Sequence, residues 1–166
     1  EGLGWGLNGF KLRTLFAVPH ADDRRFFYGL NFEFSINAAR WDESRFTSEL
    51  RPIIGWHLRP VDIVINPNID TAYDGFDKLV FAPGVRVAYN LKNDWAVAVE
   101  EYADYGPLAH LVPRGQQSHQ IYGVVDHKVG ELEVQAGVGF GATSASDGLT
   151  LKLIVARDLN PKKKGQ

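Results

Sequence analysis

Residues 27–37, with the sequence FYGLNFEFSIN, alternate between apolar and polar side chains. The alternation is clearest at Asn31, Phe32, Glu33, Phe34, Ser35 and Ile36. A two-residue period places the two kinds of side chain on opposite faces of an extended strand, whereas a helix repeats about every 3.6 residues. The segment therefore predicts a β-strand with one apolar and one polar face. If the polar face meets water on the outside, the strand belongs to a soluble barrel. If the apolar face points outward, the strand belongs to a membrane barrel.

The same two-residue period recurs through most of the chain, and Gly and Pro separate the periodic segments. We predict nine strands, at residues 7–18, 26–36, 46–58, 61–69, 79–89, 95–104, 120–126, 132–141 and 149–158. Most are about ten residues long, against ~5–6 in typical globular sheets. The predicted fold class is all-β, an antiparallel up-and-down β-barrel with hairpin connections.

The connections between these strands alternate between short and longer segments. The short connections are 59–60, 90–94 and 127–131, and the longer ones are 37–45, 70–78, 105–119 and 142–148. This alternation is typical of transmembrane barrels of the outer membrane, which have tight periplasmic turns and longer extracellular loops. A β-sandwich also mixes loop lengths, so the pattern alone leaves both folds open.

Composition excludes several function classes. The formal net charge is −2 and the pI is near 6.2, which gives no attraction to nucleic acid. Cysteine is absent, which excludes disulfides, thiolate metal sites and cysteine nucleophiles. The 166 residues suit one domain, and we assign 1–160 to a single β-barrel domain and 161–166 to a basic tail.

The polar face of the predicted strands discriminates better than the apolar face. The apolar face has no charge except near strand ends, at Glu101 and Arg157, but a soluble core would exclude charge too. The polar face mixes both signs of charge with Gly and Ala, which are poor strand formers on a solvated surface. Inside a narrow barrel, small residues leave room for facing Arg and Glu side chains. This pattern favours an apolar face turned toward lipid.

The lumen-lining residues that follow from this orientation are Glu33, Glu49, Arg51, His57, Asp62, Arg86, Glu100, Glu133 and Lys152. We expect His57 to bond a carboxylate on a neighbouring strand. One interpretation of the set is a selectivity lining for a small polar or aromatic solute. The other is a salt-bridge network that fills a barrel too narrow to conduct.

Aromatic and proline residues add two expectations. Two belts of aromatic side chains are predicted, one near the short turns at Trp56, Tyr89 and Trp95, and one near the longer loops at Phe34, Phe46, Phe81, Tyr102 and Phe140. Pro52 and Pro83 fall inside predicted strands, where a missing N–H interrupts the ladder. We expect strand bends or bulges at one level of the barrel there.

The odd number of strands predicts a larger barrel. Bacterial single-chain barrels have an even number of strands with both ends in the periplasm. With nine strands and periplasmic short turns, the first strand would begin on the outer side. We therefore expect at least one further N-terminal strand, and the chain to be the C-terminal part of a barrel of 10–12 strands.

Five segments resemble a known family: YGLNFEFS, ELRPIIGWHLRPVDIVINPNID, FAPGVRVAYNLKNDWAVAVEEYADYGPL, SHQIYGVVD and LEVQAGVGFGATSASDGLTLKLIVARDL. They are similar to bacterial outer-membrane β-barrels that are described as transporters and grouped with proteins of the phenol-degradation pathway. The resemblance extends from Phe26 to Leu159 and is most specific from GVGFG to LKLIV. It implies an outer-membrane barrel with extra strands before this region.

Candidate chemistry is sparse. Ser118, His119 and Asp126 suggest a hydrolase triad, but Ser118 and His119 are neighbours that point to opposite faces of a strand. The five histidines lack metal-ligand spacing, and no helix follows the glycine run at 137–141. We predict no catalytic, cofactor-binding or metal site, and therefore no enzyme.

The sequence thus predicts a passive channel or transporter in the bacterial outer membrane. Its expected partners are outer-membrane lipid, the barrel assembly machinery and a small-molecule solute, with no nucleic acid. Two alternatives stay open: a soluble lipocalin-like barrel that binds a small apolar ligand, and a lipid-modifying outer-membrane barrel enzyme.

Overall fold

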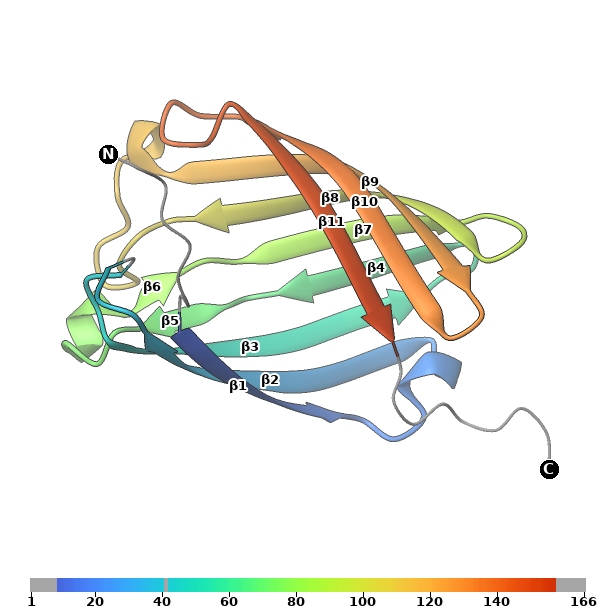
Figure 1. The fold of residues 1–166 in the computed structure, drawn as a ribbon, viewed down its shortest axis with the longest axis horizontal. Coiled ribbons are helices and arrows are strands. Elements are labelled where there is room, and N and C mark those ends of the chain that lie inside the picture. Colours follow the sequence, from blue (N-terminus) through green and yellow to red (C-terminus); the bar gives the residue numbers. More distant parts are fainter. Residues whose placement is uncertain (1–8, 41, 158–166) are drawn as a thin grey trace.

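The structure is a computed structural model that describes residues 9–40 and 42–157. One antiparallel sheet curls into a half-barrel (Figure 1). In pairing order its main strands are β1 (Gly9–Ala17), β2 (Phe26–Asn37), β3 (Phe46–His57), β4 (Val61–Asn66), β7 (Gly84–Asn90), β8 (Trp95–Asp104), β9 (Ser118–Val129), β10 (Leu132–Gly141) and β11 (Leu149–Arg157). Strands that follow one another in the chain pair in the sheet, so the predicted all-β, antiparallel, hairpin-connected class is confirmed.

Two predicted strands are each interrupted once. The predicted strand 61–69 consists of β4 and β5 (Ile69–Thr71), and the predicted strand 79–89 consists of β6 (Val80–Phe81) and β7. β5 pairs with β3 and β6, so both interrupted strands still cross the whole sheet. The predicted strand 120–126 was too short. It extends through β9, which places His127 in a strand rather than in a turn.

Short 3₁₀ helices lie in three of the connections. They are η1 (Ala21–Asp23), η2 (Phe76–Lys78) and η3 (Arg114–Gln116). The short turns gather at one end of the sheet and the longer loops at the other (Figure 1). Within the described residues no helix has the length and apolar character needed to cross a membrane. The predicted tail 161–166 lies outside the described residues.

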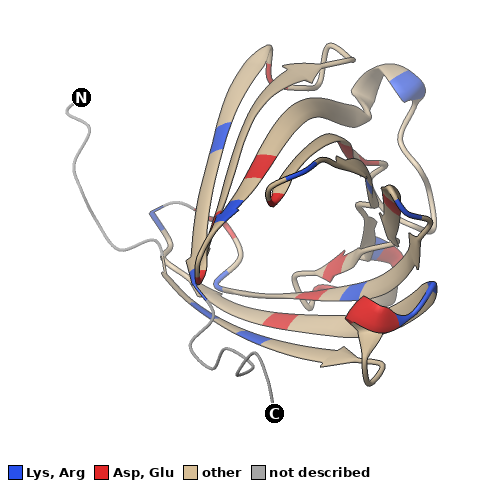
Figure 2. Cartoon of the chain, turned by 90° about the vertical axis from the view of Figure 1, so that its right-hand side faces the viewer, with Lys and Arg blue, Asp and Glu red and all other residues tan. Residues whose placement is uncertain are grey.

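The sheet is open between its two edge strands. β1 pairs with β2 and β11 pairs with β10, and no pairing joins β1 to β11 in the described residues. The nine strands of this path pair antiparallel throughout, so the two edge strands run in the same direction, from the long-loop end to the short-turn end. Viewed from the short-turn end, the strands curl around a common axis and leave this one side unpaired (Figure 2).

Three prolines align across adjacent strands and explain the interruptions. Pro67 separates β4 from β5, and Pro83 separates β6 from β7. The registers on both sides of the breaks match, because Ile54 pairs with Ile65 and Leu50 with Ile69. Pro52 therefore lies opposite Pro67, and the β4–β7 register in the same way puts Pro67 opposite Pro83. The expected disturbance is present at Pro83 as a break in the strand, but β3 is continuous through Pro52. The second break is at Pro67, which the sequence analysis did not single out, and no residue is inserted at this level.

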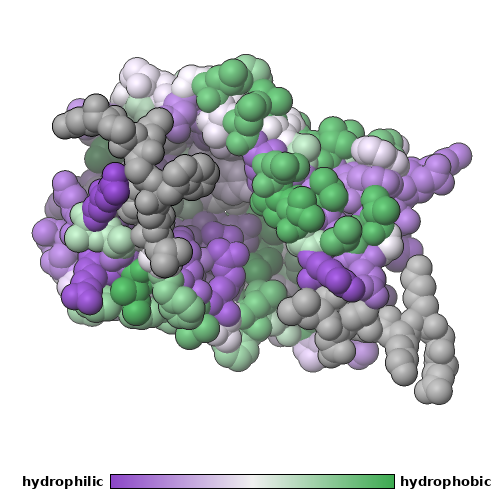
Figure 3. All heavy atoms as spheres, in the orientation of Figure 1, coloured by the Kyte–Doolittle hydropathy of each residue, from purple (hydrophilic) through white to green (hydrophobic). Residues whose placement is uncertain are grey.

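Large apolar side chains cover the convex face. Exposed residues on this face include Phe32, Val87, Val99, Ile121, Phe140 and Leu151. Along one side of the opening, Figure 3 shows hydrophobic side chains over β10 and β11. Among the described residues the buried apolar side chains are small: Ala88, Ala98, Ala103 and Val124. Residues 9–40 and 42–157 thus have their large apolar side chains on the outside and form no large apolar core.

Candidate functional site: the polar inner face

All nine predicted lumen-lining residues lie on the concave face. The register fixes this, because Glu33 pairs with Glu49 and His57 pairs with Asp62. Farther around the sheet, Arg86 pairs with Glu100 and Gly137 pairs with Lys152. A two-residue period puts every second residue of each strand on this side. The structure divides the nine among three groups, which differ in burial and partners.

The first group, here called the Glu100 cluster, consists of Arg86, Glu100, Tyr102, Asp126 and Lys152. The Glu100 side chain is only 2% exposed. Arg86 bonds both Glu100 and Asp126, and Lys152 Nζ donates to Glu100 Oε2 at 2.5 Å. The Tyr102 hydroxyl donates to the same oxygen at 2.9 Å. Four strands thus meet at one buried carboxylate and the arginine that it binds.

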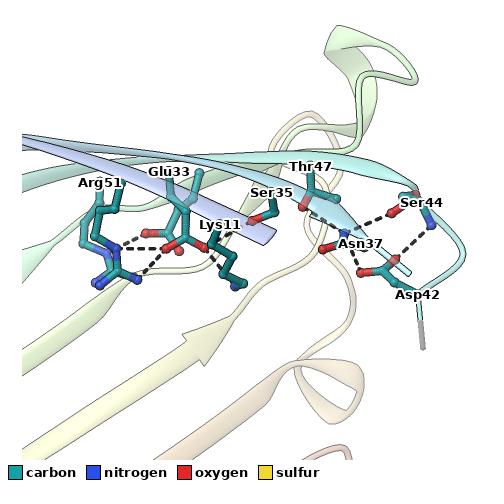
Figure 4. A network of polar contacts seen from close by, with 10 residues as sticks. Lys11, Glu33, Ser35, Asn37, Asp42, Ser44, Thr47 and Arg51 are labelled. Carbon is teal, nitrogen blue, oxygen red and sulfur yellow. Dashed lines mark hydrogen bonds and ion pairs between the residues drawn. The ribbon is translucent and has the colours of Figure 1, made fainter. Parts of the chain in front are cut away.

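The second group, here called the Glu33 cluster, joins β1 and β2 (Figure 4). Lys11 Nζ donates to Glu33 Oε1 at 2.9 Å, and Arg13 Nε donates to Glu33 Oε2 at 2.9 Å. The Glu33 side chain is 7% exposed, whereas those of Lys11 and Arg13 are 64% and 57% exposed. On β3 beside it, Arg51 Nε lies 2.6 Å from Glu49 Oε1.

The third group lies at the short-turn end. His57 Nδ1 is 2.7 Å from Asp62 Oδ1, as the sequence predicted, and Asn90 donates to the other Asp62 oxygen at 2.6 Å. The Phe27 ring stacks on the His57 imidazole with centroids 4.6 Å apart. These polar groups border a cavity of about 590 Å³ that extends to Arg86. Glu133 stands at its rim, 63% exposed and bonded to Lys128.

Inner-face glycines accommodate aromatic rings rather than the charged side chains that we expected. A Cβ on Gly55 would lie 2.1 Å from the Phe27 ring, and one on Gly139 would lie 2.5 Å from the Tyr122 ring. Glycine is required at these positions because a neighbouring ring occupies the space that a Cβ would need. The Phe27 and Tyr122 rings thus cover the inner face of the sheet at these two glycines.

Tyr102 corrects the predicted outer aromatic belt. It has the same parity as Glu100 along β8, and its hydroxyl bonds Glu100, so its side chain lies on the inner face. Its position near a longer loop suggested the belt, but the face of a strand residue is set by parity. The stacked pair Phe34 and Phe46 and the exposed Phe140 do lie on the outer face.

Sequence reasoning also missed some inner-face partners. Lys11 and Arg13 complete the Glu33 cluster, and Asp126 completes the Glu100 cluster, with Gln135 Nε2 donating to it at 2.8 Å. Extending the alternation through residues 7–18 and 120–126 would have identified Lys11, Arg13 and Asp126.

The suspected triad residues do not form one site. Ser118 Oγ bonds Ser146 Oγ at 3.4 Å, and Asp126 belongs to the Glu100 cluster. On the outer face, His119 Nδ1 lies 2.9 Å from Glu101, and its Nε2 lies 3.4 Å from the Gln117 side-chain oxygen. Within the described residues no serine or threonine hydroxyl is bonded to the His119 ring. Among the residues that the structure describes, no three His, Asp or Glu side chains are placed to hold a metal ion together.

No protein-family model, no curated protein and no solved structure matches the chain. The two faces of the sheet are therefore the features of the chain that bear on its function.

Proposed function

We propose that the chain forms the membrane-spanning wall of an outer-membrane β-barrel, along whose polar inner face small solutes pass without energy input. The observation that carries the proposal is the inverted distribution of side chains. Glu33, Ser35 and Glu100 are buried, while Phe140, Leu151 and Leu153 are 59%, 77% and 72% exposed. A water-soluble sheet of this size would place these two sets the other way around.

The outer face is suited to lipid. Transfer of one exposed Leu or Phe side chain from water to an apolar medium is worth about 1.5–3 kcal/mol. Every strand of the main path except β4 has exposed large apolar side chains on this side, so exposure of the whole face to water would favour aggregation. Its strands also suit the thickness of a bilayer, because β8 and β10 have 10 residues each and a tilted spanning strand needs about 9–11.

The direction of the edge strands supports a larger barrel. Because β1 and β11 run the same way, antiparallel closure requires an odd number of additional strands. One added strand would give ten and three would give twelve, the range expected from the sequence. A wider barrel would also leave water-filled space beside the paired charges.

The two alternatives have less support. A lipocalin-like barrel that binds an apolar ligand needs an apolar interior, whereas the concave face here holds the Glu100 and Glu33 clusters. A lipid-modifying hydrolase needs a nucleophile beside its base, and the described residues place no hydroxyl on the His119 ring.

Site-specific labelling tests the orientation of the two faces. The chain has no cysteine, so Ala96→Cys and Val97→Cys each give one labelling position. These neighbours on β8 differ in face: Ala96 borders the inner cavity and Val97 is exposed outside. In reconstituted vesicles we expect lipid-borne quenchers to quench a small fluorophore at 97 several-fold more than one at 96. A chain that is monodisperse in detergent-free buffer, or equal quenching at both positions, would contradict the proposal.

Swelling of vesicles in small sugars tests the passage of solutes separately. We expect vesicles that hold the protein to swell faster than empty vesicles. The swelling rate should fall as the size of the sugar increases. Correct quenching without swelling would retain the membrane wall and exclude the transport role.

A further inference from the structure

We infer that the strand that pairs with the free edge of β1 presents carboxylates to the inner face, opposite Lys11 and Arg13. The inference rests on the proposed function, because only a closed barrel puts a strand at that edge. The partner strand at this edge is thereby defined by its chemistry, which is an acidic inner face.

The free edge of β1 is built to accept a strand. β1 pairs with β2 along Gly9–Ala17, and its other side has no strand partner in the described residues. The N–H and C=O groups of β1 that point away from β2 form the kind of sheet edge to which an extended segment adds by main-chain hydrogen bonds. Phe10 and Leu12 on the outer side and Lys11 and Arg13 on the inner side continue the two faces of the sheet.

The charge at this edge is unbalanced. Lys11 and Arg13 share the single carboxylate of Glu33, and each of its oxygens is bonded to one of them. The Arg86 side chain, inside the sheet, is 26% exposed and binds two carboxylates, whereas Lys11 and Arg13 are 64% and 57% exposed. A strand added at β1 would cover their open side and withdraw them from water. Charges buried in this way need opposite charges beside them.

Two other occupants fit the edge less well. β11, from the same chain or from a second copy in the same membrane orientation, runs parallel to β1 and carries Lys152 on its inner face. An inverted second copy would oppose β1 to β1 and bring the same two cations together. Both arrangements add positive charge where negative charge is missing, and the first also breaks the antiparallel pattern.

Strand peptides provide the test. The probes are synthetic peptides as long as β1, which has nine residues, with valine at outward positions and either glutamate or lysine at inward positions. A donor fluorophore at Leu12→Cys on the detergent-folded chain reports binding of an acceptor-labelled peptide. We expect the glutamate peptide to bind about tenfold more tightly than the lysine peptide, and its binding to weaken as salt rises.

Charge reversal gives the decisive variant. The double variant Lys11→Glu and Arg13→Glu should reverse the preference, whereas Lys78→Gln, which removes an exposed cation at the long-loop end, should leave it unchanged. Equal binding of both peptides, an unaltered preference after charge reversal, or dimerisation that blocks the peptides would overturn the inference. The quenching test decides the proposed function independently, so a membrane-embedded chain that ignores the peptides would refute this inference alone.

Discussion

Glu100 is the most buried charged side chain that the structure describes. Whether its burial is tolerated depends on the groups that bond it. Arg86, Lys152 and the Tyr102 hydroxyl all bond its two oxygens. Moving a carboxylate out of water is costly, and these charged and hydroxyl donors offset that cost only while all of them are in place. The cluster joins β7, β8, β9 and β11, and β11 is distant in the sequence from β7 and β8. It therefore fixes how these strands sit relative to one another.

Glu100→Gln should therefore destabilise the protein by about 3 kcal/mol, because Arg86 and Lys152 would lose their shared counter-charge. Urea unfolding in detergent micelles measures the difference. Glu133→Gln is the matched control, since this glutamate is on the same face but is 63% exposed and bonded to one lysine. Its loss should cost less than about 1 kcal/mol. Equal effects of the two variants would show that the cluster does not stabilise the sheet.

At the scale of elements, the aligned prolines weaken one level of the sheet. Leu58 N donates to Val61 O, so alternate residues from Leu58 back to Pro52 bond toward β4 and β5. At the Pro52–Pro67 position neither residue has an N–H to donate. The side-chain amide of Asn66 supplies the donor instead and reaches Pro52 O at 3.1 Å. A side chain thus replaces a main-chain hydrogen bond at the break.

Asn66→Ala should cost about 1–2 kcal/mol, because Pro52 O would be left without a donor. In a Pro67→Ala background the new N–H at position 67 can serve that oxygen, and the cost of Asn66→Ala should fall. A double-mutant cycle from unfolding free energies gives this coupling. Additive effects would mean that the amide bond is not what closes the break.

At the scale of the whole molecule, one side of the sheet suits lipid and the other suits water. Alternation along each strand, repeated in register across the sheet, produces two continuous surfaces from single residues. Curling puts the polar surface inside, where small residues and aromatic rings fill the space around the charges. The same curling leaves the hydrocarbon surface facing outward, and the part of the chain that the structure describes has no second sheet to cover it.

In the proposed membrane orientation, a charge on that outer surface should be costly in proportion to its depth in the bilayer. Val99 lies in the middle of β8 and Val129 at the short-turn end of β9, and they are 58% and 56% exposed. Val99→Lys should cost about 2–4 kcal/mol and Val129→Lys about 0–1 kcal/mol. Unfolding from lipid vesicles measures both. Equal costs would argue that no bilayer surrounds this face.

The sequence predicted the strands well because alternation is a local property. Eight of the predicted inner-face residues lie within the curved sheet and Glu133 lies at the rim of the cavity, all with the expected parity. The misses have non-local causes. Tyr102 was placed by its distance from a loop rather than by parity, and the break at Pro67 depends on which residue faces it from β3.

By itself, the sequence determined the nine main strands and the separation of apolar from polar side chains, since both follow from a two-residue period within each strand. Only the tertiary structure decided which charges meet. Arg86 and Asp126 are brought together by strand order and register, and Glu33 takes two cations because β1 lies beside it. Curvature, too, belongs to the assembled sheet, because strand twist and cross-strand packing act between segments that are far apart in the chain.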